Sequence, residues 1–248
     1  MNNVVTLEEK GSDIVLLTMK DEVSKNTFSP ELLQGLQQAF SHINQHPTYK
    51  VVVMTGYDSY FCSGGTQEAL LSLSEKEGNF TKGGIYSMPL DCRIPVVAAM
   101  QGHGIGGGFV FGLFSDYVIL GRESVYTTNF MKYGFTPGFG GTCILREKLG
   151  LGLAQEMLMG ADTYRGEDLK QRGITFPVYP RDQVLDKAME TARLLAEKPR
   201  VSLITLKDHL VEDIRQKLPS VVEKEVAMHN KTFHLPEVKE RIKTVFGR

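Results

Sequence analysis

The 248-residue sequence has only three cysteines, Cys62, Cys92 and Cys143. They are odd in number and far apart, and none stands in a C-x-x-C pair. A disulfide framework or a zinc site is therefore not expected. Reduced cysteines are typical of the cytoplasm, which is the location that we predict.

Neither sign of charge dominates. The 28 lysines and arginines nearly balance the 29 aspartates and glutamates, and the net charge is −1. The basic residues are spread along the chain, so no basic patch indicates nucleic-acid binding. No cluster of His, Cys, Asp or Glu has the spacing of metal ligands, and we predict no metal site.

Long hydrophobic runs are also missing. No apolar stretch approaches the roughly 18 residues that a membrane-spanning helix needs. Residues 1–10 lack the layout of a signal peptide. We therefore expect no membrane segment in a chain whose composition, 42% hydrophobic and 23% charged, is typical of a globular protein.

Sheet-forming segments fill the first half of the chain. Residues 4–7 and 13–19 form short apolar segments on either side of a polar turn, which predicts two antiparallel strands. Ser29 precedes Pro30 and a run of leucines at helical spacing, so a helix is expected to begin there. The β-branched run 49–56 predicts a buried strand. A strand, a helix and a strand in this order favour a parallel sheet covered by helices.

The second half is mostly helical. Its predicted helices span 142–149, 153–159, 165–172, 181–198, 201–218 and 220–233. We therefore predict the α/β class, with one core domain, residues 1–190, that carries a helical C-terminal region, residues 191–248.

A glycine-rich stretch, Gln101–Gly108, stands between a buried apolar strand and an apolar helix start. Its glycines remove the Cβ atoms that would keep a ligand from the backbone, and the first N–H groups of a helix lack partners inside it. The stretch is either a packing turn or an anion site, for a phosphate or an oxygen that becomes negative during a reaction. It is not a dinucleotide fingerprint, because no such pattern opens the chain with an acidic residue roughly 20 positions later.

Two further glycine-rich loops occur, at 61–65 and 134–141. In this order the loops resemble those of the crotonase, or enoyl-CoA hydratase/isomerase, superfamily, and the likeness covers nearly the whole chain. The matching pieces are 61–65, 94–108, 115–117, 134–141 and 160–173. The resemblance implies a spiral of ββα units with a helical C-terminal region that packs into a homotrimer or a dimer of trimers.

Members of this superfamily bind a thioester and stabilise its enolate with two backbone N–H groups. By motif position these groups belong to Gly65 and Gly107, and the residue types agree, because glycine lets an oxyanion approach the backbone. The resemblance gives His103 the structural role of supporting its turn. The further residues expected to contact the substrate and its arm are Phe61, Ser63, Gly64, Gly106 and Tyr86.

The departures from the family decide the predicted reaction. Hydratases of the superfamily use two glutamates to activate water and to protonate carbon, and the matching positions here are Val110 and Phe130. Neither side chain can move a proton, so hydration by that mechanism is excluded. We expect Val110 and Phe130 to line an apolar substrate pocket, where an intact oxyanion hole can still promote loss of carbon dioxide.

Three segments, 64–68, 130–138 and 206–210, resemble the second hydratase-like protein of polyketide β-branching cassettes. Those proteins decarboxylate a 3-methylglutaconyl thioester on an acyl carrier protein, giving a 3-methylcrotonyl thioester. The resemblance implies this reaction, with the carrier protein as partner. Phosphopantetheine arrives with the substrate, so no other cofactor is expected.

The same resemblance supplies two catalytic side chains, a histidine on the C-terminal helix and a lysine from a loop. The histidine is His229, which could protonate the dienolate at a pKa near its ordinary value. The lysine, which could hold the distal carboxylate, is Lys76 or Lys82. We favour Lys82 because it precedes two glycines and stands near Tyr86.

Two alternatives stay open. A double-bond isomerase would need a base near the α or γ carbon, for which His229 is the candidate. A non-catalytic scaffold with the crotonase fold is compatible with the loss of both glutamates, although the intact oxyanion glycines argue against it. An acidic carrier protein should be received by basic residues near the pocket mouth. The candidates are Arg93, Arg122, Lys132 and Lys207.

Overall fold

The computed structural model describes residues 3–75 and 84–246. Its larger sheet has six strands, in the spatial order β1 (Val5–Glu9), β2 (Ile14–Met19), β3 (Val51–Thr55), β5 (Val96–Met100), β7 (Tyr117–Gly121) and β10 (Val178–Tyr179). β1 pairs with β2 antiparallel, as predicted, and every other pair of neighbours in this sheet is parallel. The predicted α/β class is confirmed.

Side chains of the parallel strands alternate between two hydrophobic cores. In β3, Val52 and Met54 belong to the main core, whereas Val51 and Val53 belong to the layer under helix α8 (Val184–Ala196). β2 and β5 alternate in the same way. Every residue of β3 and β5 is buried, which is why these strands read as continuous apolar runs.

The smaller sheet carries the first two glycine-rich loops. It contains β4 (Tyr60–Cys62), β6 (His103–Ile105), β8 (Val125–Thr127) and β9 (Thr163–Arg165). The first three pair in parallel, and β9 pairs antiparallel with β8. The sequence prediction missed β6, β8 and β9, because strands of three residues are too short to show a period.

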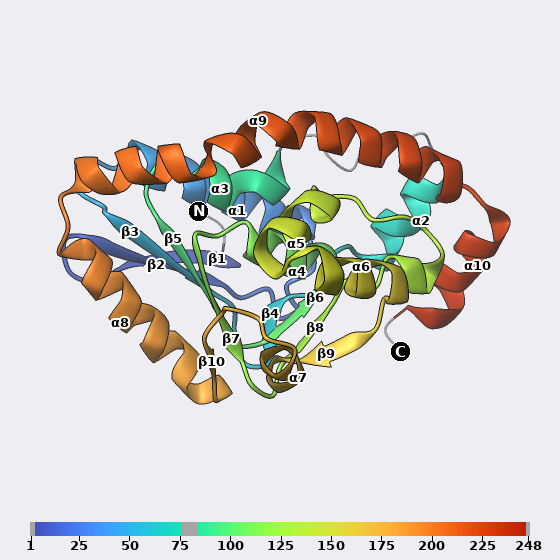
Figure 1. Cartoon of the computed structure of the whole chain (residues 1–248), viewed down its shortest axis with the longest axis horizontal. Helices are drawn as coiled ribbons and strands as arrows, with labels where there is room; N and C mark the ends of the chain where they lie inside the picture. Colours follow the sequence, from blue (N-terminus) through green and yellow to red (C-terminus); the bar gives the residue numbers. More distant parts are fainter. Residues whose placement is uncertain (1–2, 76–83, 247–248) are drawn as a thin grey trace.

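Helices surround both sheets (Figure 1). α1 (Pro30–Gln45) begins as predicted, because Ser29 Oγ accepts a hydrogen bond from the Leu32 amide at 3.1 Å. The other helices are α2 (Gln67–Glu75), α3 (Met88–Asp91), α4 (Gly107–Leu113), α5 (Gly141–Leu149), α6 (Leu151–Gly160), α7 (Gly166–Gln171), α9 (Arg200–Thr232) and α10 (Pro236–Val245), with short 3-10 helices η1 (Ile85–Ser87), η2 (Met131–Tyr133) and η3 (Arg181–Gln183). Across the described residues, no helix combines the length and the apolar character that a membrane span requires.

α9 runs along one side of the molecule without a break, where two helices were predicted (Figure 1). Pro219 lies inside it and removes one backbone donor, which normally ends or kinks a helix. Leu218 and Val222 are buried on either side of this proline, so packing against the core continues across it. α10 follows and was not predicted. The predicted division after residue 190 falls inside α8 and stays a prediction.

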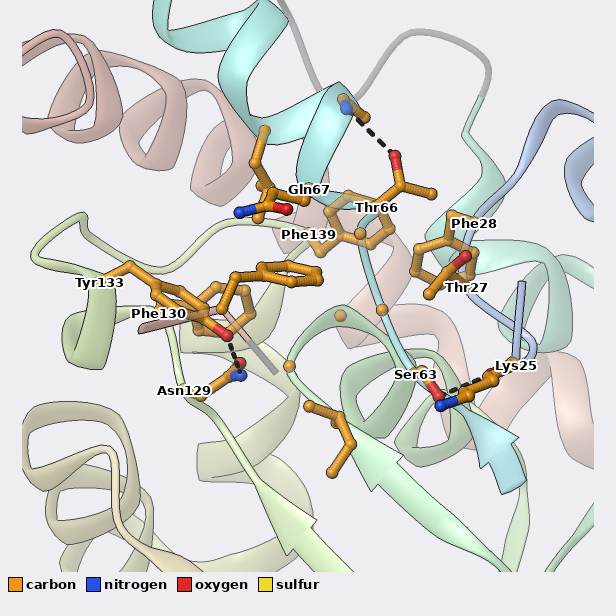
Figure 2. A pocket seen from close by; sticks show the side chains of 18 of the residues that line it. Lys25, Thr27, Phe28, Ser63, Thr66, Gln67, Asn129, Phe130, Tyr133 and Phe139 are labelled. Atoms are coloured by element: carbon orange, nitrogen blue, oxygen red, sulfur yellow. Dashed lines mark hydrogen bonds between the residues drawn. The ribbon is translucent and has the colours of Figure 1, made fainter. Parts of the chain in front are cut away.

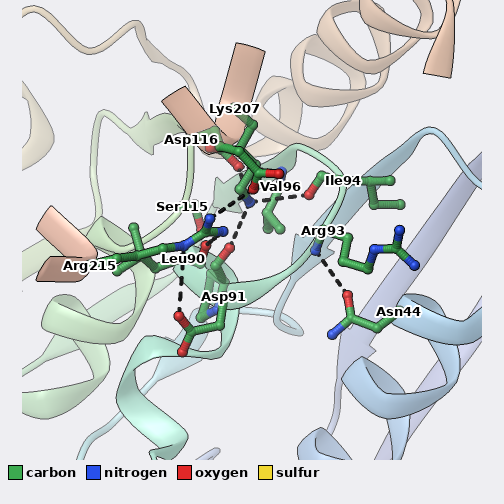
Figure 3. A network of polar contacts seen from close by, with 12 residues as sticks. Asn44, Leu90, Asp91, Arg93, Ile94, Val96, Ser115, Asp116, Lys207 and Arg215 are labelled. Carbon is green, nitrogen blue, oxygen red and sulfur yellow. Dashed lines mark hydrogen bonds and ion pairs between the residues drawn. The ribbon is translucent and has the colours of Figure 1, made fainter. Parts of the chain in front are cut away.

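A buried ion pair ties α9 to the larger sheet (Figure 3). Lys207 Nζ lies 2.7 Å from Asp116 Oδ2 and also donates to the carbonyl oxygens of Pro89, at 2.9 Å, and Ile94, at 3.1 Å. Asp116 in turn accepts from the Val96 amide at the start of β5, at 2.8 Å. Because Lys207 is only 3% exposed, it does not receive a carrier protein, which corrects the sequence-based expectation.

Replacing Lys207 by Met should lower the free energy of unfolding by about 3 kcal/mol, because the Asp116 carboxylate, whose side chain is only 15% exposed, then loses its cation. Lys217→Met is the matched control on the same helix. Its ion pair with Asp213 is exposed, so the loss should stay below about 1 kcal/mol. Urea unfolding followed by circular dichroism measures both, and equal effects of the two substitutions would contradict the stabilising role of the Lys207 pair.

Candidate active site

The first two glycine-rich loops touch each other through their backbones. A Cβ atom added to Gly64 would lie 2.6 Å from Ile105 O and 3.3 Å from Gly107 N. One added to Gly108 would lie 2.2 Å from Cys62 O. Gly64 also has a φ of 76°, a conformation that favours glycine. The missing Cβ atoms at these positions are what let the two loops come so close.

This contact brings Gly65 and Gly107 to the wall of one cavity. Gly107 is the first residue of α4, as predicted, so its N–H has no acceptor inside the helix. Gly65 stands just after β4, and in the described part of the chain its amide donates to no other backbone group. Two amides without backbone acceptors, at residues that line one cavity, are candidates for stabilising an oxygen that becomes negatively charged.

The cavity has a volume of about 920 Å³, and several aromatic side chains stand in its wall (Figure 2). Its aromatic lining residues are Phe28, Tyr60, Phe130, Tyr133, Phe135, Phe139 and Phe246. The rings of Phe28 and Phe139 stack with 5.3 Å between their centroids. Among the described lining residues, the lysine and carboxylate side chains, Lys25, Glu68 and Lys132, are all exposed, so formal charge gathers at the rim. The interior therefore suits an apolar acyl group.

The hydratase glutamate positions differ in their placement. Phe130 lines the cavity, as predicted, and no carboxylate replaces it there. Val110 is completely buried and does not line the cavity, because its side chain packs beneath Gly141. Its predicted place in the substrate pocket is therefore corrected. Glu68 is the one carboxylate among the described lining residues, and it is exposed in the first turn of α2.

Most other predicted site residues meet at the cavity. Ser63, Gly64, Gly106 and His229 line it together with the two amide-bearing glycines. Two predictions are corrected. Phe61 is completely buried, and Tyr86 packs its ring against Phe139 at 5.7 Å, so both stand behind the wall. Lys76 and Lys82 lie outside the described residues.

Of the remaining carrier-binding candidates, Lys132 lines the cavity. Arg93 and Arg122 are exposed away from it, and Arg122 lies 3.8 Å from Glu167. Sequence analysis missed Lys25, which lies in a loop that no motif marks and which is exposed at the rim.

Asn26 holds the first glycine-rich loop in place, and sequence analysis missed it too. This completely buried side chain donates to Met19 O at 2.9 Å and Phe61 O at 3.0 Å, and it accepts from the Asp21 amide at 2.7 Å. Its own carbonyl accepts from the Ser63 amide at 2.9 Å. These bonds fix the end of β4, from which the loop starts. No motif in the sequence marks this residue.

His229 reaches the cavity from α9. Its Nδ1 lies 2.9 Å from Thr136 O, and a carbonyl only accepts, so Nδ1 carries a proton. The ring stacks on Phe233 with 4.4 Å between centroids. Burial lowers the pKa of His229 to about 4, so the imidazole is neutral at neutral pH. The expectation of a pKa near its ordinary value is therefore corrected.

The same face of α9 also holds the third glycine-rich loop. Glu225, which is 2% exposed, accepts from the amides of Gly140, at 2.7 Å, and Thr142, at 2.8 Å, and from the Thr142 hydroxyl at 2.5 Å. The Thr232 hydroxyl accepts from the Thr136 amide at 3.2 Å. Glu225 does not line the cavity, and its oxygens cap the start of α5. It therefore fixes the wall and does not replace a hydratase glutamate.

Several other candidate groups are structural. His103 Nδ1 accepts from the Val125 amide at 3.0 Å, which joins β6 to β8 and agrees with its predicted supporting role. All three cysteines are buried and free, and burial raises the pKa of the Cys62 thiol to about 12. Within residues 3–75 and 84–246, no group of three or more His, Cys, Asp or Glu residues could hold a metal ion.

Comparison with known proteins identifies the family. Residues 9–246 match the enoyl-CoA hydratase/isomerase family. The chain belongs to this family. A chain from the structures of a dehydratase/decarboxylase enzyme couple involved in polyketide β-branching is 60% identical, with a TM-score of 0.98 over 99% of this chain and 100% of that one. The ECH2 decarboxylase domain of CurF from Lyngbya majuscula is 47% identical, with a TM-score of 0.94 over 99% and 100%.

Curated relatives separate the reactions within the family. Bacillaene synthase decarboxylase PksI of Bacillus subtilis is 60% identical over 246 residues, 99% of each chain. Mitochondrial enoyl-CoA hydratase of Pongo abelii is only 25% identical, over 77% of this chain and 67% of that protein. The predicted membership of the crotonase superfamily is confirmed, as are its fold and the prediction that the chain is a decarboxylase of that superfamily.

Gly108→Ala should lower kcat by roughly 10²–10³, because its Cβ forces Cys62 O away and separates the two glycine-rich loops, which is equivalent to losing one oxyanion donor. Gly152→Ala is the control. Its added Cβ meets nothing within 4 Å, and Gly152 lies in α6, outside the cavity. Steady-state kinetics on both variants, with circular dichroism to verify folding, makes the comparison. A folded Gly108→Ala variant with unchanged kcat would contradict the role of the contact.

The stability of the protein should depend on the protonation of His229. The pKa of this side chain is 6.5 in the unfolded chain and about 4 in the folded one, so between these values the unfolded chain binds more protons. The stabilising contribution is fully present above pH 6.5 and is lost as the pH falls to 4, by about 3 kcal/mol.

His229→Gln keeps a donor for Thr136 O and removes the titration, so its stability should change less over this pH range. Urea unfolding at several pH values gives both profiles. Parallel profiles for the wild type and the variant would show that His229 does not stay neutral in the folded protein.

Proposed function

We propose that this protein decarboxylates a 3-methylglutaconyl thioester on an acyl carrier protein, giving a 3-methylcrotonyl thioester. One observation carries the proposal. Gly65 and Gly107 line the same apolar cavity, while Val110 and Phe130 occupy the hydratase glutamate positions. The 60% identity to bacillaene synthase decarboxylase over the full chain supports it.

The two amides hold the thioester oxygen. When the distal carboxyl group leaves as carbon dioxide, the electrons of the broken carbon–carbon bond pass through the neighbouring double bond to this oxygen and form a dienolate. The negative charge thus moves from a carboxylate in an apolar cavity to an oxygen that accepts two hydrogen bonds. Each such donor typically contributes roughly 3–4 kcal/mol to transition-state stabilisation.

The substrate itself supplies the charge that His229 needs. A carboxylate that enters the same cavity raises the pKa of the imidazole, so the ring takes up a proton when substrate binds. Loss of carbon dioxide moves this negative charge to the dienolate, and the imidazolium then stands beside a carbon base that can accept its proton. His229 gives its proton to carbon, and the neutral ring is restored. Lys82, or Lys76, holds the distal carboxylate before it leaves.

The partner is the acyl carrier protein, whose phosphopantetheine arm enters with the substrate, so no resident cofactor or metal is needed. Lys25 and Lys132 at the rim suit an acidic carrier. We also propose the cytoplasmic location and the homotrimer or dimer of trimers that the family resemblance implies. Val201, Leu206 and Leu210, which are 73%, 57% and 67% exposed on α9, suit contact between subunits.

Incubation with carrier protein loaded with the 3-methylglutaconyl group, followed by mass spectrometry of the intact carrier, tests the reaction. The proposal expects the arm to lose the mass of one carbon dioxide. An unchanged mass with a moved double bond would instead identify an isomerase. A bound thioester that is never turned over would identify a scaffold.

His229→Gln should lower kcat by about 10²–10⁴, because the variant cannot act as a general acid. His209→Gln, an exposed position on the same helix, should keep the wild-type kcat. Single-turnover decarboxylation on the loaded carrier measures both. Full activity of His229→Gln would remove this residue from the proton transfer.

A further inference from the structure

One hydroxyl in the cavity wall is buried without a partner. Thr27 lines the cavity, and its Oγ1 is shielded from solvent and makes no hydrogen bond to any described group. Thr127, in the same wall, shows the usual arrangement, in which the hydroxyl donates to a carbonyl oxygen, here Asp162 O at 2.9 Å. Buried hydroxyl groups nearly always make a hydrogen bond, so we expect the Thr27 hydroxyl to bond to a group that is not part of the described protein.

Thr27 stands between the rim and the oxyanion amides. Lys25 is exposed at the rim, and Phe28 lies against Gly107, where an added Cβ would meet Phe28 Cε2 at 3.1 Å. Figure 2 shows Lys25, Thr27 and Phe28 along one side of the cavity. Thr27 also forms a parallel bridge with Gly64, next to the first oxyanion glycine. Its hydroxyl is therefore close to the path from the rim to the reaction centre.

The backbone around Thr27 is held in one conformation. Lys25 and Asn26 have φ angles of 53° and 52°, a backbone conformation that lysine rarely adopts and that asparagine tolerates. The Phe28 amide donates to Gly64 O at 2.7 Å, which fixes the other side of Thr27. The side chain keeps one freedom, because rotation about χ1 exchanges the hydroxyl and the methyl group between staggered positions. A ligand in the cavity can thus recruit the hydroxyl without moving the backbone.

We propose that the Thr27 hydroxyl binds an amide of the phosphopantetheine arm and so fixes the position of the arm. This inference rests on the proposed function in one respect, namely that the thioester oxygen sits at Gly65 and Gly107. From there the arm runs to the rim past Thr27, while the acyl group extends to the other side of the thioester carbon. A hydroxyl both donates and accepts, so it pairs with either half of an amide.

Calorimetric titration with 3-methylcrotonyl-pantetheine, the product thioester without its carrier, measures this contact in the absence of any reaction. Thr27→Val has the same shape without the hydroxyl and should bind about 2- to 12-fold more weakly. Thr27→Ser keeps the hydroxyl and should bind within twofold of the wild type, roughly. Thr191→Val, on α8 and outside the cavity, should leave the Kd unchanged. Equal Kd values for the wild type and Thr27→Val would overturn the proposal.

Stability separates a binding role from a merely structural one. Thr27→Val removes an unpaired buried hydroxyl, so its urea unfolding midpoint should equal or exceed that of the wild type while its affinity falls. A structural hydroxyl would lower both, and a lowered midpoint for the folded variant would overturn the proposal.

A comparison of carrier-bound and coenzyme A thioesters gives a last control for contact with the arm. Carrier-bound and coenzyme A thioesters share the arm, so Thr27→Val should raise KM for both by the same factor with little change in kcat. A loss confined to one source would contradict contact with the arm. If the wild type binds the pantetheine thioester but releases no carbon dioxide from the loaded carrier, the proposed reaction fails and the Thr27 contact stands. If the wild type releases carbon dioxide but Thr27→Val binds the pantetheine thioester as tightly as the wild type, only the Thr27 contact is rejected.

Discussion

The direct packing of Gly64 against the Gly107 amide is the constraint on which the rest of the site depends. It requires β4 beside β6 in the smaller sheet, with Asn26 holding the end of β4. Because the contact is made by backbone atoms, side chains around it can change without moving the two amides. This explains how Phe130 can stand in a hydratase glutamate position while the contact between the two loops is kept.

α9 connects this site to the body of the protein. At one end Lys207 bonds to Asp116 and to the segment that leads into β5. Further along, Glu225 and His229 bond to the third glycine-rich loop, which forms part of the cavity wall. One continuous helix thus positions the His229 imidazole relative to the sheet. The packing across Pro219 matters for the same reason, since a break there would uncouple the imidazole from the larger sheet.

Local and periodic features of the fold were predictable from sequence. Ser29 and Pro30 marked the start of α1, the run 49–56 contained β3, and Gly107 was expected to open a helix. Side chains whose role depends on distant neighbours were not predictable. Val110 follows Gly107 in the chain, but the turn of α4 directs it beneath Gly141.

Burial explains the other differences. The family motif identified His229, yet its neutral state follows from the residues that surround it in the folded chain, which no motif records. Lys207 was predicted to be a surface lysine, because its ion-pair partner Asp116 is far away in the sequence. Thr27 and Asn26 lie between β2 and α1, in a segment that no sequence motif marks. Their contacts with β4 and the first glycine-rich loop, through Phe61 O and Gly64, become visible only in the folded structure.

The most direct test is the infrared spectrum of a bound thioester that cannot lose carbon dioxide, with an isotope label on its carbonyl carbon. If the Gly65 and Gly107 amides hold the thioester oxygen, two hydrogen bonds polarise the carbonyl, and its stretching band should lie at a lower frequency in the protein than in water. A band at or above the frequency in water would show that the oxygen is not held by these amides, and the account of the site would be wrong.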